Sequence, residues 1–312
     1  MKGKIFWASI LIITLSYIGN YIYFHTKQLD APIFLEHFYE LTMNEEDETT
    51  LPFYYLTNKS DQSNVNFIRI DGVEAYADSN GNFMWESQAP QFEQEYTHHY
   101  LKAVNVSFPS EYEGDSPLSF SEIEVHFSDG KTVQANIGKV TLHKRMENPN
   151  VLETRISSSS NQHREEKSMV ALQPITIEKI EIPFASDLSD DILMKVDLEQ
   201  KRLGELEKLM TGANPPDWFD EERDKEWSDL PGVLLNDNLL PLHLKQNEWI
   251  RFLMQFNPER DSYYQFSIKL FGKTESGEEF VRELPINDQL DLDQKTINRI
   301  IKAKESGETN EF

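Results

Sequence analysis

The chain has 312 residues, a formal net charge of −24 and no cysteine. This charge disfavours nucleic acid and anionic lipid headgroups as partners, because both carry charge of the same sign. The lack of cysteine excludes disulfide bonds, thiolate catalysis and cysteine-ligated metals. An apolar core must therefore hold the fold, and the chain is long enough for one large or two ordinary domains.

The first predicted element is an apolar helix that begins at Ile5 and ends at Phe24. These 20 residues would span roughly 30 Å, the thickness of the hydrocarbon core of a bilayer. The alternative is a cleaved secretory signal, which needs a shorter apolar region and a small-residue cleavage site. No such site follows Phe24. We therefore predict that residues 1–28 form a cytoplasmic tail and an uncleaved transmembrane anchor.

The basic residues that flank this helix predict its orientation. Lys2 and Lys4 precede the helix, whereas Lys27 alone follows closely behind it. Because positively charged flanks stay on the cytoplasmic side, the N-terminus is expected inside the cell. The remainder of the chain is then extracytoplasmic, and a cell membrane protein of a bacterial envelope fits this arrangement.

Most of the chain after the helix alternates apolar and polar residues, the pattern of half-buried strands. The clearest examples are 123–127 with a returning strand at 132–137, and two neighbouring strands at 250–256 and 264–270. Further predicted strands cover 33–39, 53–56, 66–70, 99–108, 140–143, 175–182 and 192–198. Many short strands separated by turn residues predict a mainly β protein built from antiparallel, immunoglobulin-like β-sandwiches.

A polar segment at 153–168 interrupts this pattern and predicts a linker. It would separate a first sandwich at 29–152 from a second sandwich at 169–312. A long hairpin loop within one domain is the alternative. In both interpretations the strands resume near Ala171.

The second sandwich carries a predicted insertion near 200–231. Leu203, Leu206 and Leu209 have helical spacing and predict a short helix. The long acidic loop behind it contains Trp218 and Trp227. Exposed tryptophans stack on sugar rings or anchor protein interfaces, so these two are the candidate binding residues. Alternatively, both rings fold down as a lid over the sheet, and Trp249 is expected in the core.

We find no catalytic, metal or cofactor motif in the sequence. His98 and His99 are adjacent, so on a strand they point to opposite faces and do not share a metal. Gly272-Lys273-Thr274 has the letters that end a phosphate loop but lacks the upstream glycine, and we interpret it as a hairpin turn. No cofactor and no metal are therefore predicted.

These observations favour a non-catalytic interaction or accessory module of the bacterial envelope. Its expected partners are the lipid bilayer, through the N-terminal helix, and an envelope or membrane protein. A membrane-tethered hydrolase that acts on cell-wall polymer or lipid is the alternative function. A ligand sensor that signals through a membrane partner is a third hypothesis.

Overall fold

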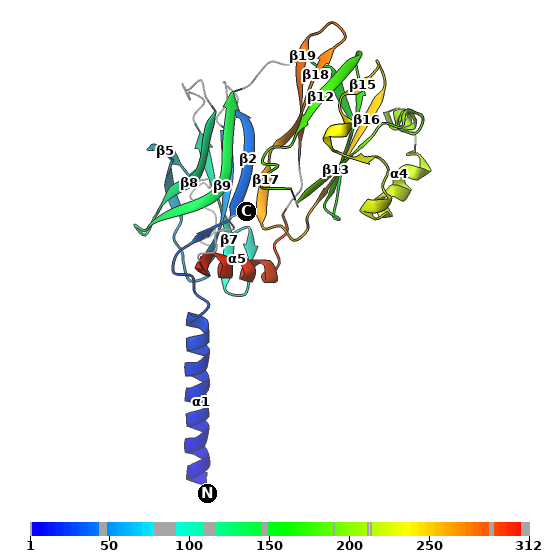
Figure 1. The fold of residues 1–312 in the computed structure, drawn as a ribbon. Coiled ribbons are helices and arrows are strands. Elements are labelled where there is room, and N and C mark those ends of the chain that lie inside the picture. The colour runs from blue at the N-terminus through cyan, green and yellow to red at the C-terminus, as the bar shows by residue number, and fades with distance from the viewer. Residues whose placement is uncertain are drawn as a thin grey trace.

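A long N-terminal helix precedes a body made of β-sheets (Figure 1). The computed structural model describes residues 2–43, 49–70, 72–77, 92–108, 117–144, 149–189, 191–210, 212, 214–286 and 290–306. Helix α1 (Lys2–His25) is exposed along its length, and its residues Gly3–His25 are apolar enough to cross a membrane. A signal sequence near an N-terminus can also be long and apolar enough to meet this criterion. The predicted apolar helix is therefore confirmed, and its retention as an anchor stays a prediction.

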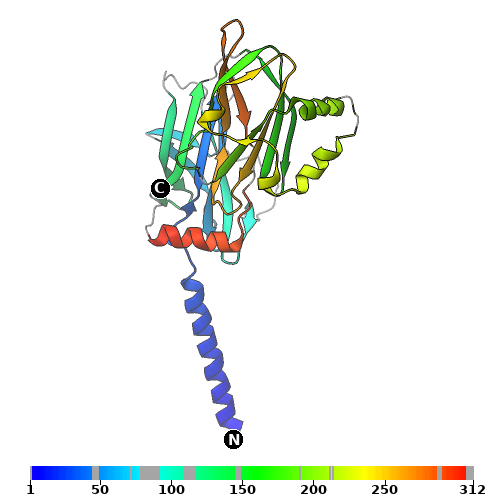
Figure 2. The same ribbon diagram turned by 45° about the vertical axis from the view of Figure 1, so that its right-hand side comes forward.

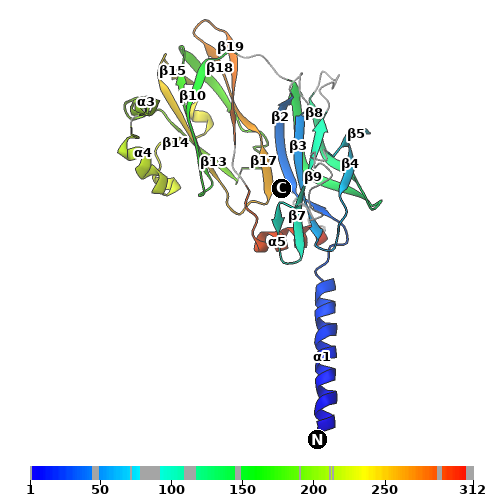
Figure 3. The same ribbon diagram turned by 180° about the vertical axis from the view of Figure 1, so that it is seen from behind.

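Two sheets next to α1 form the first layered unit (Figure 3). The six-stranded sheet has the order β17 (Ser262–Gln265), β2 (Glu36–Met43), β9 (Thr132–Lys144), β8 (Leu118–Phe127), β4 (Val65–Ile70), β5 (Val73–Tyr76). The four-stranded sheet has the order β1 (Ile33–Phe34), β3 (Thr49–Asn58), β7 (His99–Phe108), β6 (Gln94–Glu95). Their inner faces share one core, where Leu51 and Phe53 cluster with Ile123 and Val125.

Two further sheets form the second layered unit, farther from α1 (Figure 1). The five-stranded sheet has the order β10 (Leu152–Ser160), β11 (Arg164–Ala171), β16 (Trp249–Phe256), β13 (Ile192–Asp197), β14 (Val233–Leu234). The four-stranded sheet has the order β15 (Leu242–Leu244), β12 (Ile175–Glu181), β18 (Ser267–Thr274), β19 (Glu279–Pro285). Phe252 and Met254 of the first sheet cluster with Ile177 and Ile268 of the second.

The mainly β architecture is thus confirmed, but the expected purely antiparallel pairing is wrong for β2. This strand pairs in parallel with both β9 and β17. Parallel neighbours need a long crossover connection, and alternation of apolar residues does not reveal such a connection. The immunoglobulin-like identity of the two units stays a prediction.

The two neighbouring strands predicted at 250–256 and 264–270 do not pair with each other. β16 lies in the five-stranded sheet, and the second predicted strand is divided into β17 and β18. β17 joins the first layered unit, whereas β18 returns to the sheet opposite β16. The prediction of strands in these segments is correct, because alternation indicates which side chains are buried. Alternation does not indicate which strand is the partner.

Residues 153–168 are not a linker in the structure. They belong to β10 and β11, which pair as an antiparallel hairpin from Leu152↔Ala171 to Ser160↔Arg164. β10 is an edge strand, and its serines are largely solvated. An exposed edge strand favours polar residues, so its composition resembles that of a linker. The domain bounds 29–152 and 169–312 assign β17 to the second unit. In the structure, β17 pairs with β2 and is the edge strand of a sheet of the first unit.

An aromatic stack lies where β17 joins β2. Tyr263 of β17 stacks on Tyr54 with the ring centroids 3.9 Å apart, and His37 of β2 stacks on Tyr263 at 5.5 Å. Gly138 of β9 lies opposite His37 in the parallel register. We call this junction the seam, and it ties the last third of the chain to the first layered unit.

Gly138→Ala is expected to destabilise the protein by roughly 1–3 kcal/mol. Gly138 has a φ of 91°, and a Cβ there would lie 2.4 Å from the carbonyl oxygen of His37. Gly130 has a φ of 85° but nothing within 4 Å of the same atom. Gly130→Ala is therefore the matched control for backbone strain alone. Urea denaturation should show a larger loss for Gly138→Ala, and equal losses would contradict a steric role.

Helix α5 (Gln294–Ser306) packs under the first layered unit. Ile297 and Ile300 are buried in a cluster with Leu35 and Leu56. The hydroxyl of Tyr96 donates a hydrogen bond of 2.9 Å to the carbonyl of Leu292, just before the helix. The end of the described chain is thus bound close to α1 (Figure 2).

The end of α1 is hydrogen-bonded to the sheets. The side chain of Asn58 accepts from the backbone N–H of Leu29 at 2.9 Å and donates to its carbonyl at 2.8 Å. The Nε2 atom of His99 lies 2.9 Å from the carbonyl of Lys27. These contacts hold residues 27–29, which we call the neck, against the ends of β3 and β7.

Candidate functional site

Residues 200–231, which we call the cover segment, pack on the outer face of the five-stranded sheet (Figure 2). The segment contains α2 (Gln200–Leu203), η1 (Gly204–Leu206), α3 (Glu207–Met210), α4 (Asp217–Glu221), η2 (Glu222–Asp224) and η3 (Trp227–Asp229). Its first turns confirm the predicted short helix. Leu203, Leu206 and Phe219 bury their side chains against Val170 and Trp249.

A buried network of charges joins the cover segment to the sheet. The guanidinium of Arg251 donates to Glu166 Oε2 at 2.7 Å and to Glu222 Oε2 at 2.5 Å. Arg202 binds the second oxygen of Glu222 at 2.9 Å and also pairs with Asp197. Burial opposes the charge on Arg251, but its two carboxylate partners outweigh burial and raise the pKa of the guanidinium.

The half-buried side chain of Trp218 covers the two arginines of this network. Its Nε1 atom donates a hydrogen bond of 3.0 Å to Glu205. The ring lies over Arg202 and Arg251, with centroid distances of 5.0 and 5.4 Å. These contacts occupy the ring within the protein. These contacts agree with the alternative interpretation, in which the ring folds down over the sheet, and a binding role of Trp218 stays a prediction.

Trp227 begins η3 and is held in place by one buried lysine. The Nζ atom of Lys195, on β13, donates to the carbonyls of Trp227 at 2.7 Å and Leu230 at 2.9 Å. The same ammonium lies 5.0 Å from the centroid of the Trp227 ring. Burial lowers the pKa of Lys195. One side chain thus fixes the position of η3 on the sheet.

An open cavity of about 580 Å³ lies beside Trp227. Its lining combines the indole with aliphatic, amide and charged side chains: Gln162, Arg164, Asp191, Leu193, Glu226, Trp227, Gln255, Phe256, Asn257 and Pro258. Asp191 is occupied by structural bonds, because it accepts from the Tyr264 hydroxyl at 2.7 Å and from the Asn257 amide at 2.8 Å. The cavity is therefore a mixed apolar and polar surface.

Exposed aliphatic side chains continue this surface. Leu193 on β13 is 43% exposed, and Leu234 on β14 is 50% exposed. β14 is the edge strand of its sheet, and Leu234 lies opposite Lys195, on the same face of the sheet as Leu193. We call the cavity together with Leu193 and Leu234 the Trp227 surface. Trp218 does not line the cavity, so the structure separates the two tryptophans that the sequence grouped together.

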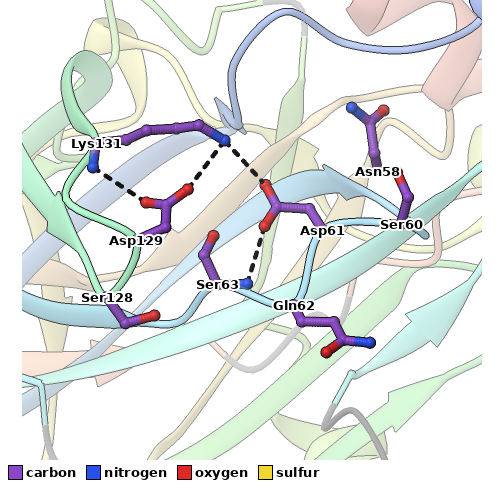
Figure 4. Close-up of a pocket in the computed structure, with 8 residues that line it drawn as sticks. All are labelled: Asn58, Ser60, Asp61, Gln62, Ser63, Ser128, Asp129 and Lys131. Atoms are coloured by element: carbon purple, nitrogen blue, oxygen red, sulfur yellow. Dashed lines mark hydrogen bonds and ion pairs between the residues drawn. The ribbon is translucent and has the colours of Figure 1, made fainter.

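A second cavity, of about 520 Å³, lies between the end of β3 and the β8–β9 turn (Figure 4). The Nζ atom of Lys131 pairs with Asp129 at 3.0 Å and lies 3.9 Å from Asp61. Burial would raise the pKa of Asp61, but hydrogen bonds from Ser63 outweigh it, and the pKa is lowered. A general acid needs a raised pKa, and Asp61 does not have one.

Within the described residues, no group of three or more histidines, cysteines or carboxylates is arranged to hold a metal. Gly272-Lys273-Thr274 lies at the end of β18, directly before the turn to β19. A Cβ on Gly272 would lie 2.2 Å from the carbonyl oxygen of Thr176. This glycine therefore permits close strand packing rather than phosphate binding.

The sequence did not single out Lys195 or the leucines of the Trp227 surface. Leu193 and Lys195 occupy the face of β13 that alternates with the buried Met194 and Val196. A leucine on a polar face is a weak signal of an exposed apolar site. A lone lysine there normally indicates a solvated position, and nothing in the sequence reveals the carbonyls that it binds.

Neither a protein-family model nor a curated protein matches this chain. Among solved structures, a β-glycosidase from Bacteroides vulgatus is similar with 10% identity and a TM-score of 0.19, over 83% of this chain. The chain spans only 25% of the length of that enzyme. The YadV chaperone is similar with 7% identity and a TM-score of 0.18, over 82% of this chain and 98% of the chaperone. Likeness at this level assigns no function.

Proposed function

We propose that this protein is a non-catalytic, membrane-anchored interaction module of a bacterial envelope that binds a protein partner through the Trp227 surface. In this proposal α1 crosses the membrane with its N-terminus in the cytoplasm, and both layered units are extracytoplasmic. The observation that carries the proposal is the group of exposed aliphatic side chains beside a positioned tryptophan.

The composition of the Trp227 surface is typical of a protein interface. Single exposed apolar residues are common, but contiguous apolar patches rimmed by polar groups mark interaction sites. Here Leu193 and Leu234 lie on one face and are each more than 40% exposed, and the cavity beside them is rimmed by Arg164 and Glu226. Tryptophan is enriched among the residues that dominate binding energy.

The Trp227 surface is also prepared for binding before a partner arrives. Lys195 fixes η3 through two carbonyl hydrogen bonds, so little ordering is required on association. Val233 and Leu234 form an edge strand, and an edge offers unpaired backbone groups to a partner segment. Both features support a protein partner over a small substrate.

Retention of α1 is supported by the contacts of its last turn. The rings of Tyr23 and Phe24 lie against His98, with centroid distances of 5.9 and 6.4 Å. Together with the bonded neck, these contacts make the end of α1 part of the folded structure. A signal cleaved within the neck would lose them.

A photo-crosslinking amino acid at Leu234 tests the proposal in cells. We expect a crosslinked adduct with a defined envelope or membrane protein. Trp227→Ala should lower the yield of this adduct at least tenfold, because a tryptophan at the centre of an interface contributes about 2 kcal/mol or more. Mass spectrometry of the adduct and its quantity on immunoblots provide the measurement.

Tyr76→Ala is the matched control, because Tyr76 is an aromatic residue that is 66% exposed on another edge strand, β5. This change should leave the adduct unaltered. An equal loss in both variants, or no protein adduct at all, would contradict the proposed partner surface. Turnover of wall polymer or lipid by the purified protein would instead favour the hydrolase alternative.

A further inference from the structure

Helix α5 lies across the end of the body that is nearest to α1. Figures 1, 2 and 3 place it beside the neck and transverse to α1. The neck is bonded to β3 and β7, and α5 is packed under the same unit. If α1 crosses a bilayer, α5 is therefore held close to the headgroups on the outer side.

The two faces of α5 differ in chemistry. Ile297 and Ile300 are buried under the first layered unit. Lys295, Arg299 and Lys302 are exposed and follow the spacing i, i+4, i+7, which places them on one side of a helix. We call these three residues the basic face, and it points away from the sheets that α5 packs against.

The charge of α5 is opposite to that of the chain. The helix contains Lys295, Arg299, Lys302 and Lys304 but only one acidic residue, Glu305, whereas the chain carries −24. Such a local excess of positive charge defines an electrostatic surface distinct from the rest of the protein.

Not every basic residue of α5 is available. Lys304 pairs with Glu36 at 3.5 Å, and Arg299 donates to the carbonyl of Glu259 at 2.6 Å. Arg299 also pairs with Asp261 at 3.5 Å. Among the residues that the structure describes, Lys295 and Lys302 form no ion pair, although the charge of Lys295 helps to lower the pKa of Asp293. These two ammonium groups are thus the available charges of the basic face.

Two acidic residues, Asp291 and Asp293, precede α5 and do not belong to the basic face. Asp293 caps the helix by accepting from the backbone N–H of Thr296 at 2.7 Å, and this bond lowers its pKa. Asp291 is exposed two residues earlier. Both lie before the first turn, whereas the basic face extends over the following turns.

We propose that the basic face of α5 rests on the anionic phospholipid headgroups of the bilayer that α1 crosses. This inference rests on the membrane anchoring given under the proposed function. Each lysine near an anionic leaflet raises the ratio of membrane-bound to free protein about fivefold. Lys27, in the neck, adds a further positive charge next to the end of α1. The body would then approach the membrane in one orientation, despite the negative charge of the whole chain.

The full-length protein in lipid nanodiscs tests this proposal. The chain has no cysteine, so Asn298→Cys provides a single fluorophore site on the exposed side of α5. Headgroup-nitroxide lipids should quench this fluorophore in discs that contain phosphatidylglycerol, and much less in discs of phosphatidylcholine alone. Lys295→Glu with Lys302→Glu should lower the contacting population by at least tenfold, given the fivefold effect of each charge.

The control for charge is Lys245→Glu with Lys273→Glu, which makes the same change near the far end of β15 and β18 (Figure 1). It should leave the quenching at position 298 unaltered. A fluorophore at Ser276→Cys, in the β18–β19 turn, should stay unquenched in both kinds of disc. Equal quenching at position 298 with and without phosphatidylglycerol would overturn the proposal, as would equal effects of the two charge changes.

A second fluorophore position separates this inference from the anchoring. Tyr17→Cys places the label within α1, where acyl-chain nitroxides should quench it strongly. A quenched Tyr17→Cys label with an unquenched Asn298→Cys label would overturn the α5 contact alone. An unquenched Tyr17→Cys label would overturn the anchoring and the α5 contact together.

Discussion

Arg251→Ala is expected to destabilise the protein by roughly 3–5 kcal/mol, because it removes the central partner of a buried ion cluster. Arg251 is 1% exposed and bridges Glu166 of β11 to Glu222 of the cover segment. Removing the guanidinium leaves Glu166 without its ion pair and Glu222 with Arg202 as its remaining partner. The free energy of unfolding, measured in urea with the full-length protein in detergent, should fall by that amount.

The change should also loosen the cover segment from the sheet. The Trp218 ring lies over Arg251, so its fluorescence should shift to the red as water reaches the indole. Arg223→Ala is the matched control, because Arg223 belongs to the same segment but is 65% exposed and forms a surface ion pair with Asp220 at 3.5 Å. Such surface pairs contribute at most about 1 kcal/mol.

A triple variant distinguishes the charges from the packing. Arg251→Met together with Glu166→Gln and Glu222→Gln removes the unpaired charges and retains most of the volume. Neutral replacement of a buried ion cluster is often close to neutral in stability, so much of the lost stability should return. A loss below about 1 kcal/mol in Arg251→Ala would contradict a stabilising role of the network.

The sequence predicts the strands well where one face of a strand is buried. The alternation of Ile123 and Val125 with polar residues reports burial on one side, which is a property of neighbouring residues in the chain. Partner choice is different, because β17 finds β2 more than 200 residues away, as the pairing Tyr264↔Phe38 demonstrates. Local alternation contains no information about such a partner.

The candidate site was predicted only in part for the same reason. A tryptophan in a long acidic loop predicts a binding residue, and this argument applies to Trp218 and Trp227 alike. Their environments differ through distant contacts: Arg251 lies under Trp218, and Lys195 lies under Trp227. Both cations belong to strands, β16 and β13, whose alternating sequences do not reveal which distant aromatic ring each cation contacts.

His37 is expected to make the protein sensitive to acid. The side chain is fully buried at the seam, where its Nε2 atom accepts from the backbone N–H of Tyr54 at 3.0 Å. The Nδ1 atom lies 3.3 Å from the carbonyl of Ile137 and donates to it. Protonation of Nε2 would break the bond to Tyr54 and place a charge in the core.

Burial lowers the pKa of His37 from 6.5 to about 3, with the carbonyl of Ile137 opposing this change in part. Between these two pH values the unfolded chain binds a proton that the folded protein does not. The stability is therefore fully present above pH 6.5 and decreases as the pH falls toward 3. The slope is about 1.4 kcal/mol per pH unit, and the whole window corresponds to about 5 kcal/mol.

His37→Gln isolates this contribution, because the glutamine carbonyl can accept from Tyr54 without titrating. The difference in unfolding free energy between the wild-type protein and this variant should change by about 1.4 kcal/mol per pH unit, with the wild type losing stability as the pH falls. Urea denaturation midpoints between pH 7 and 4.5 provide the measurement. His243→Gln is the control, since His243 is exposed on β15, and it should run parallel to the wild type. Parallel curves for His37→Gln and wild type would show that acid acts elsewhere. A difference confined to His37 would mean that the loss of stability in acid arises from the protonation of a side chain at the seam.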